Sequence, residues 1–419
     1  MNKISLFQLV FLTVGAMVGS AVFSLSGVTI MQAGDLAVLS WAFAGLLLLG
    51  FGFVTTNLLN AVEISNGDIK LHDFPALAFK SNFLGYITSW IYLFGCTAGV
   101  SFSAIYFAHY LVNVFPVLLP IVHILPTLSV LIIYILNLLK IGQLTRINTV
   151  LTILLVLILI LIAFVLCLHS NSSSHDVNIF PTSSNNLLDM LSQIPISMLA
   201  YGAIVVPAFM ASSVVNPKKN VRLGMFIAMI LTTTIYCVVI FATLRFINAQ
   251  YLIEHHESVF SPITAALDVA ELPNSFTLLV NFAAVLALFT TMLVVGKLGV
   301  SSVENIFPKQ ESKARFSTEK LSSGLFFAVV FIVTLFYTKV QLVIDSGALF
   351  NALFTLIICA SGFQLTKTKS HKILALFIAV VISITYIPTL VNANTALYIT
   401  TIIYLVLGYA IWCIRKRIK

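Results

Sequence analysis

The sequence contains few charged residues. Only 9% of its 419 residues are Asp, Glu, Lys or Arg, whereas soluble proteins carry about 25%. Hydrophobic residues make up 60%, and the mean hydropathy is +1.07. They gather in runs of roughly 20 residues, the length that a helix needs to cross a bilayer. The composition excludes a soluble globular chain and predicts an all-α polytopic membrane protein.

Motifs of catalysis and of metal binding are also absent. The sequence has no H-E-x-x-H, no phosphate-binding P-loop and no paired carboxylates inside the apolar runs. Its five cysteines lie apart in apolar runs, and the adjacent His255 and His256 fall in a polar loop. We therefore expect no enzymatic activity, no metal and no cofactor. The net charge of +8 comes from short loops between apolar runs, which argues against a nucleic-acid partner.

The apolar runs divide the chain into about twelve predicted transmembrane segments. They span roughly residues 5–30, 36–61, 84–114, 119–139, 147–169, 188–214, 221–246, 273–298, 320–338, 342–364, 371–391 and 394–414. An even number places both termini on one side of the membrane. Twenty of the 22 lysines and arginines fall on that side, and only Arg245 and Lys339 fall on the other. The positive-inside rule then predicts cytoplasmic termini, and the short outer loops are typical of a bacterial inner membrane.

The first segment contains small residues at its centre. Residues 15–23 read GAMVGSAVF, with two glycines and a serine where leucine would give a more stable helix. In a membrane, freed backbone groups persist only where protein or a water-filled cavity satisfies them, so a broken helix here would mark a binding site. The alternative is that the small residues admit a neighbouring helix. The sixth segment is interrupted in a similar way, by Gly202 and Pro207.

The two interrupted segments occupy corresponding places in two halves of the chain. Gly15 and Gly202 are 187 residues apart, and the same offset brings the second and third segments close to the seventh and eighth. Interrupted helices in corresponding positions indicate a secondary transporter. We predict one transmembrane domain with repeats at 5–170 and 188–365, followed by two additional helices at 371–414. Because each repeat holds five helices, the second is expected to be inverted.

Four short motifs resemble those of a known family. They are residues 15–23 (G-x-x-x-G-S-G-V-F in the family), 83–86 (FLGY), 216–221 (NPKKNV, with Arg222 where proline is usual) and 305–308 (NIFP, similar to G-L-F-P). In order and spacing they resemble the amino acid–polyamine–organocation superfamily. Within it, the chain is most similar to the basic amino acid/polyamine antiporter group, which includes the bacterial arginine–agmatine exchangers.

The resemblance implies a five-plus-five inverted-repeat fold of the LeuT type, with helices 1 and 6 broken. It implies a site between those helices, walled by helices 3, 8 and 10. The substrate carboxylate is expected at Gly19–Ala21 and its amino group at carbonyls of Ala200–Gly202, because helix N-termini attract anions and unwound carbonyls suit an ammonium group. The substrate-binding residues so predicted are Gly15, Ala16, Gly19, Ser20, Ala21, Tyr92, Met198, Ala200, Tyr201, Gly202, Ile204 and Thr290.

The wall of this predicted site departs from that of the exchangers. Ile204 occupies the position at which the exchangers have an acidic residue in helix 6. Met198 and Thr290 occupy the positions of the aromatic residues that clamp the substrate in the exchangers. Val100 replaces a helix 3 amide, although Tyr92 keeps the tyrosine. Since no charged side chain remains to grip a guanidinium, we expect a neutral or zwitterionic amino acid rather than arginine or a polyamine.

The candidates for ion coupling are two hydroxyls and one histidine. Thr290 and Thr291 could face the first helix in a sodium-type site, or bond their own backbone. His109 could relay protons or bond a neighbouring helix. The coupling ion (H⁺ or Na⁺), a counter-substrate and a homodimer all stay open.

These observations favour a secondary active transporter, a permease or an antiporter that moves an amino acid by alternating access. Its expected partners are the lipid bilayer and a small amino acid or amine substrate. Two alternatives stay open. One is an amino-acid sensor or other non-transporting protein on the same fold, and the other is a cationic amino acid or polyamine exchanger.

Overall fold

The structure is a computed structural model that describes residues 3–61, 71–139, 141–170, 174, 176–180, 184–256, 261–307, 315–335, 339–391 and 394–418. These residues form helices joined by short connections. They contain no strand, and one isolated β-bridge pairs Ile4 with Val214. The prediction of an all-α polytopic protein is confirmed.

Seventeen α-helices follow one another along the described chain. They are α1 (Leu6–Ser24), α2 (Ser26–Ala33), α3 (Ala37–Ala61), α4 (Phe74–Phe79), α5 (Asn82–Val114), α6 (Leu125–Asn137), α7 (Ile141–Leu168), α8 (Ser184–Ala200), α9 (Val206–Phe209), α10 (Pro217–Leu244), α11 (Ala249–Glu254), α12 (Pro262–Val269), α13 (Asn274–Ile306), α14 (Arg315–Thr334), α15 (Val340–Leu365), α16 (Lys369–Val391) and α17 (Thr395–Ile418). Five 3₁₀ helices join them: η1 (Gly34–Leu36), η2 (Leu71–Asp73), η3 (Pro116–Ile121), η4 (Gly202–Val205) and η5 (Ala211–Ser213).

Each of the twelve predicted segments contains a helix. In the described chain, nine helical stretches are long and apolar enough to cross a membrane, and a bent pair, residues 186–200 with 202–209, makes a tenth. The fourth and ninth segments hold shorter apolar helices, α6 and residues 320–334 of α14. The fourth segment begins later than predicted. Its first residues form part of η3, where Pro116 and Pro120 lack the N–H that a regular helix needs.

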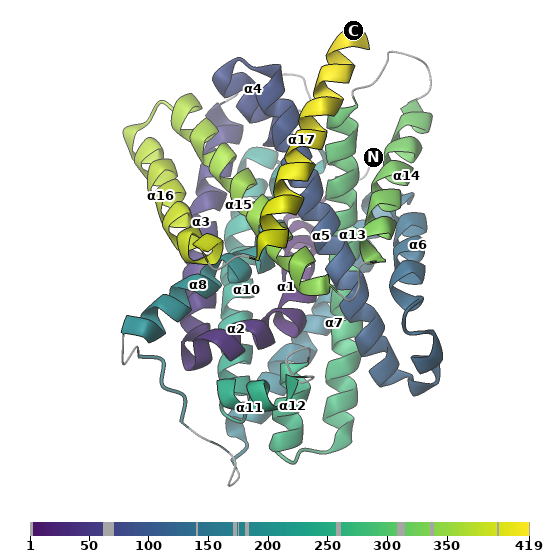
Figure 1. The fold of residues 1–419 in the computed structure, drawn as a ribbon, viewed down its shortest axis with the longest axis vertical. Helices are drawn as coiled ribbons and strands as arrows, with labels where there is room; N and C mark the ends of the chain where they lie inside the picture. The colour runs from purple at the N-terminus through teal and green to yellow at the C-terminus, as the bar shows by residue number, and fades with distance from the viewer. Residues whose placement is uncertain are drawn as a thin grey trace.

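The loops on the two sides of the bundle also carry short helices. The predicted cytoplasmic loop at 62–83 contains η2 and α4, while its residues 62–70 lie outside the described chain. The predicted outer loop at 247–272 contains α11 and α12. Figure 1 shows α11 and α12 at one end of the bundle, and α4 with both chain ends toward the other. The breaks in the long helices lie between these two ends.

Helices α1, α5 and α13 form the centre of the bundle. The most apolar stretch of α5 is 83% buried and that of α1 is 76% buried, whereas the values for α16 and α17 are 28% and 11%. The last two helices therefore lie at the periphery, as Figure 1 shows, and leave most of their surface to lipid. The site must be sought where α1, α5 and α13 meet the interrupted sixth segment.

Two arginines hold the ends of long helices. The Arg415 guanidinium donates to the Ile306 carbonyl at the end of α13, at 2.6 Å. Arg245 donates to the carbonyls of Leu166 (3.3 Å) and Cys167 at the end of α7. The last carbonyls of a helix have no intrahelical donor, and the negative end of the helix dipole favours a cation there. Both arginines therefore stabilise the helix ends that they reach.

Candidate functional site

The sixth predicted segment is broken, as its sequence indicated. Helix α8 ends at Ala200, and the chain continues through η4 and α9 with a bend of 43°. Pro207 lies in the first turn of α9, where its missing N–H costs no helical hydrogen bond. Gly202 opens η4, and a Cβ atom there would lie 3.3 Å from both amide atoms of Asn351 on α15. The glycine thus lets the Asn351 amide approach the backbone of the break.

The first predicted segment is interrupted at Leu25 rather than at Gly19–Ala21. Helix α1 runs without a break through residues 15–23, and α2 begins at Ser26. Figure 1 shows α2 lying across the direction of α1. A Cβ atom on Gly15 would collide with Thr152 and Asn148 of α7, and one on Gly19 would collide with Thr291 and the Ala287 carbonyl of α13. The structure therefore favours the alternative in which these glycines admit neighbouring helices.

A small cavity lies between α1, α5, the break in the sixth segment, α13 and α15. Its lining residues are Ala16, Tyr92, Gly95, Cys96, Gly99, Phe102, Leu199, Ala200, Gly202, Ala203, Thr291, Val295, Leu298 and Asn351. Among the described residues no charged side chain lines it. A ligand would meet backbone groups, small and apolar side chains, and the polar groups of Tyr92, Cys96, Thr291 and Asn351.

Two threonines of α13 bind the backbone of α1 beside this cavity. The Thr290 hydroxyl donates to the Gly15 carbonyl at 3.2 Å and to the Ala287 carbonyl of its own helix at 2.8 Å. The Thr291 hydroxyl donates to the Ala16 carbonyl at 3.3 Å. Thr290 thus faces the first helix and also bonds its own backbone, while its role in ion coupling stays a prediction. Thr291 lines the cavity, whereas Thr290 is fully buried behind it.

Aromatic rings lie around Tyr92 on one side of the cavity. The Tyr92 ring stacks on Phe209 of α9, with centroids 5.0 Å apart and 12° between the planes. It also contacts Phe354 of α15 at 4.4 Å, and the buried His72 of η2 lies 5.4 Å from Phe209. These rings come from both sides of the cavity and from the loop before α4. They form an aromatic cluster beside the cavity.

A second aromatic cluster joins the two interrupted segments. The Tyr236 hydroxyl of α10 donates to the Met17 carbonyl of α1 and to the Ala200 carbonyl at the break, the latter at 3.5 Å. The Tyr201 hydroxyl donates to the Trp41 carbonyl of α3 at 3.0 Å. The rings of Trp41 and Tyr236 meet edge to face at 4.6 Å. Tyr236 therefore ties the backbones of both interrupted segments together.

The structure brings part of the predicted site to the cavity. Of the predicted substrate-binding residues, four line it: Ala16, Tyr92, Ala200 and Gly202. The other predicted residues whose side chains are described do not line it. Gly15 and Gly19 face α7 and α13, and Ala21 and Met198 are buried elsewhere. Tyr201 reaches α3, Ile204 lines a different cavity between α3 and α10, and Thr290 lies behind Thr291. The backbone of Ser20 lies within α1.

His109 does not lie with the threonines. It is exposed near the end of α5. His109 is not among the residues that line the cavity, and its role as a proton relay or as a partner of a neighbouring helix stays a prediction.

Two functional candidates were not visible in the sequence. Asn351 is 9% exposed and lines the cavity, and within the described chain its side-chain amide makes no hydrogen bond. Tyr236 is fully buried. Each is a single polar residue in an apolar segment, which is a weak signal. The role of such a residue depends on whether its side chain faces the cavity, and the sequence did not indicate which side of the helix does so.

The comparison with protein families decides the identity. Residues 4–414 match the model of a family described as amino acid permease. The chain belongs to the amino acid permease family. A comparison with curated proteins finds no match. Membership places the permease in the amino acid–polyamine–organocation superfamily and among transporters rather than enzymes. It also agrees with the multi-pass arrangement of apolar helices. The closer likeness to arginine–agmatine exchangers stays a prediction.

Proposed function

We propose that the permease moves an amino acid with an uncharged side chain across the cytoplasmic membrane through the cavity between α1, α5, α13 and the sixth-segment break. The observation that carries the proposal is the lining of that cavity, which includes Asn351 and Tyr92 and, among the residues that the structure describes, no charged side chain. An arginine side chain or a polyamine would lose its hydration there without gaining a carboxylate. An uncharged side chain pays no such penalty.

The ends of the substrate would be held by backbone groups. The break in the sixth segment places Ala200 and Gly202 at the cavity. Backbone dipoles can serve the carboxylate and ammonium groups of a zwitterion without a charged side chain. We infer that residues 5–170 and 188–365 are inverted repeats that rock around this site, with both termini cytoplasmic. The rings of Tyr92 and Phe209 would then separate on the cytoplasmic side.

Ion coupling would use the contact between α1 and α13. Two threonine hydroxyls and the carbonyls of Gly15 and Ala16 bring four oxygen atoms together. A sodium ion bound there would accept the lone pairs of these oxygens, and the hydroxyl protons would turn away. Uptake by proteoliposomes with an inward Na⁺ gradient, an inward H⁺ gradient or an internal amino acid would distinguish symport with either ion from exchange.

The test of the proposal is uptake of radiolabelled amino acids by proteoliposomes that contain the full chain. Gly95 lines the cavity, and a Cβ atom there would meet nothing within 4 Å. Gly95→Phe is therefore expected to fill the cavity and abolish uptake. Gly142→Phe is the matched control, because the space beside Gly142 in α7 is equally open and lies outside the cavity. Normal uptake by Gly95→Phe would contradict this route.

The specificity is tested separately with Asn351. Asn351→Asp places a carboxylate in the cavity wall, so arginine uptake should rise and neutral uptake should fall. Asn351→Ala should only weaken neutral uptake, by about fivefold if one hydrogen bond of ~1 kcal/mol is lost. Arginine uptake by the unmodified permease would refute the substrate class and leave transport standing. If no amino acid moves while a thermal-shift screen detects one as a ligand, a sensor replaces the transporter.

A further inference from the structure

Two adjoining cavities open between α3 and α10, away from the central cavity. The first is a shallow depression lined by Thr56, Leu59, Asn60, Ala211, Pro217, Lys218, Val221 and Arg222. The second is equally shallow and is lined by Leu49, Gly52, Phe53, Thr56, Ile204, Arg222, Met225 and Phe226. They share Thr56 and Arg222, so they form one continuous groove, which we call the α3–α10 groove.

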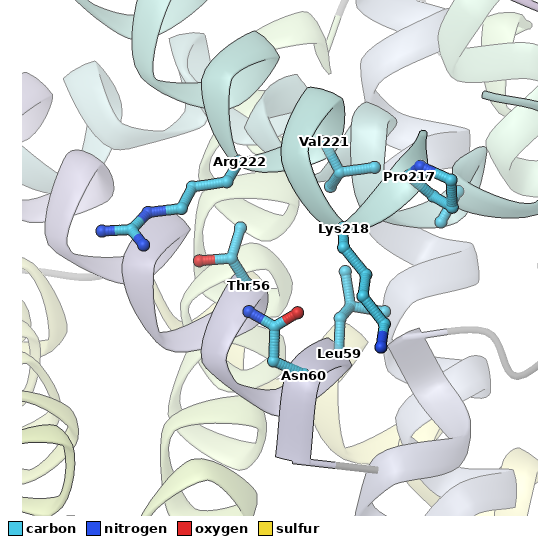
Figure 2. A pocket seen from close by; sticks show the side chains of 8 residues that line it. Thr56, Leu59, Asn60, Pro217, Lys218, Val221 and Arg222 are labelled. Atoms are coloured by element: carbon cyan, nitrogen blue, oxygen red, sulfur yellow. The ribbon is translucent and has the colours of Figure 1, made fainter. Parts of the chain in front are cut away.

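The first cavity is the cationic end of the groove. Figure 2 shows Lys218 extending from α10 toward Leu59 and Asn60 of α3, with Arg222 on the other side of Thr56. Both basic side chains are exposed, and neither forms an ion pair with a carboxylate in the described chain. No acidic residue is among the described lining. The cavity therefore presents two cations and an amide with no counter-charge of its own.

The second cavity is the apolar end. Apart from Thr56 and Arg222 its described lining is apolar and comes from α3, α10 and η4, and Phe226 is 39% exposed on the outer surface of α10. The Arg222 guanidinium lies 5.7 Å from the centre of the Phe53 ring, at the boundary between the two ends. The groove thus has basic residues at one end and an apolar slot that begins one helical turn farther along α10. A phospholipid has the same order of groups, with a charged phosphate followed by acyl chains.

We propose that the α3–α10 groove binds an anionic phospholipid of the leaflet that faces the chain termini. Its phosphate would lie beside Lys218, with Arg222 turning from the Phe53 ring toward it, and one acyl chain would lie along the surface of the slot beside Gly52 and Phe226. Basic residues at this depth attract anionic lipid, by about 1 kcal/mol each. A soluble anion would use only the first cavity. Continuity with an apolar slot inside the membrane is what selects a lipid.

The groove reaches the break in the sixth segment. Ile204 of η4 lines its apolar end, while Gly202 and Ala203 of the same turn line the central cavity. A lipid chain in the slot would touch the turn that borders the central cavity. The lipid site itself does not depend on the proposed transport.

Binding can be measured by native mass spectrometry of the full chain in detergent, titrated with phosphatidylglycerol, phosphatidylcholine or inorganic phosphate. Phosphatidylglycerol should bind in preference to phosphatidylcholine. The double variant Lys218→Gln/Arg222→Gln should weaken phosphatidylglycerol about fivefold for each charge removed. The matched control is Lys219→Gln/Lys416→Gln. It removes the same charge, but Lys219 lies outside the groove and Lys416 lines a separate cavity beside Arg415.

The apolar end is tested with Gly52. A Cβ atom there would lie 3.8 Å from Ile204 and 3.9 Å from Met225, so Gly52→Ala should fit without disturbance. Gly52→Leu should fill the slot and weaken phosphatidylglycerol, with a monodisperse elution profile showing that the variant folds. Equal binding of both lipids, or equal loss in the two double variants, would overturn the proposal. So would inorganic phosphate that displaces phosphatidylglycerol, because the site would then belong to a free anion.

Discussion

The first and sixth apolar segments are both interrupted and both rich in small residues, yet glycine has different roles in them. In the first, Gly15 and Gly19 lie inside a continuous helix and allow α7 and α13 to approach its backbone. In the sixth, Gly202 stands at the break itself and faces a side-chain amide. A small residue in a membrane helix can thus serve packing or a binding site, and the atom that a Cβ would meet distinguishes the two.

The largest effect is expected for Gly19→Ala. The new methyl group would collide with the Ala287 carbonyl of α13, and backbone cannot move away as a side chain can. Overpacking of this kind costs about 1–3 kcal/mol, so the unfolding temperature and the yield of folded permease should fall. Gly142→Ala is the control, because a methyl group there meets nothing within 4 Å. Equal stability of the two variants would mean that α1 and α13 are not in close contact.

An intermediate effect is expected for Tyr236→Phe. Loss of the hydroxyl removes the donor shared by Met17 and Ala200, which should cost about 1 kcal/mol of stability. Uptake should fall further than stability explains, because the two interrupted segments lose their common contact. Tyr404→Phe loses a comparable bond to the Trp90 carbonyl at the periphery and should keep its uptake. The same uptake in both variants would contradict a role for Tyr236 in joining the segments.

The smallest effect on stability is expected for Gly202→Ala. The new methyl group would meet the Asn351 amide at 3.3 Å, and that side chain can turn aside. Reduced chain entropy in the unfolded state is worth about 0.4–1 kcal/mol and offsets part of the crowding. Uptake should nevertheless decrease, because Asn351 is moved within the cavity. A variant that loses stability as Gly19→Ala does would show that Gly202 is a packing glycine too.

Much of the fold could be predicted from the sequence. Apolar runs predicted the position of a helix in each of the twelve segments, although only nine helices and one bent pair of the described chain are long enough to cross a membrane. Gly202 with Pro207 indicated the break after Ala200, because glycine and proline act through the local backbone. The break at Leu25 could not be predicted in this way. Leu25 is neither glycine nor proline, and the nearest glycine, Gly27, lies inside α2 rather than at the break.

The candidate site was less predictable. Helices such as α1 and α13 are apolar on nearly every side, so no periodicity shows which side faces the centre. Tyr201 was expected at the cavity but reaches Trp41, and Asn351 was passed over although it lines the cavity. Only the packing of five helices decides such orientations. Residue type gave a list of candidates, and rotation of each helix about its axis selected among them.

The four residues of the 3₁₀ turn η4 separate the central cavity from the α3–α10 groove. Gly202 and Ala203 face the central cavity, and Ile204 faces the α3–α10 groove. The amino acid, which comes from water, and the lipid, which comes from the bilayer, would not contact each other. They would contact opposite sides of the same four residues. Thermodynamic linkage makes such a wall reciprocal: the factor by which lipid changes the affinity for the amino acid equals the factor by which the amino acid changes the affinity for lipid. Membrane composition would then act as an effector of this permease.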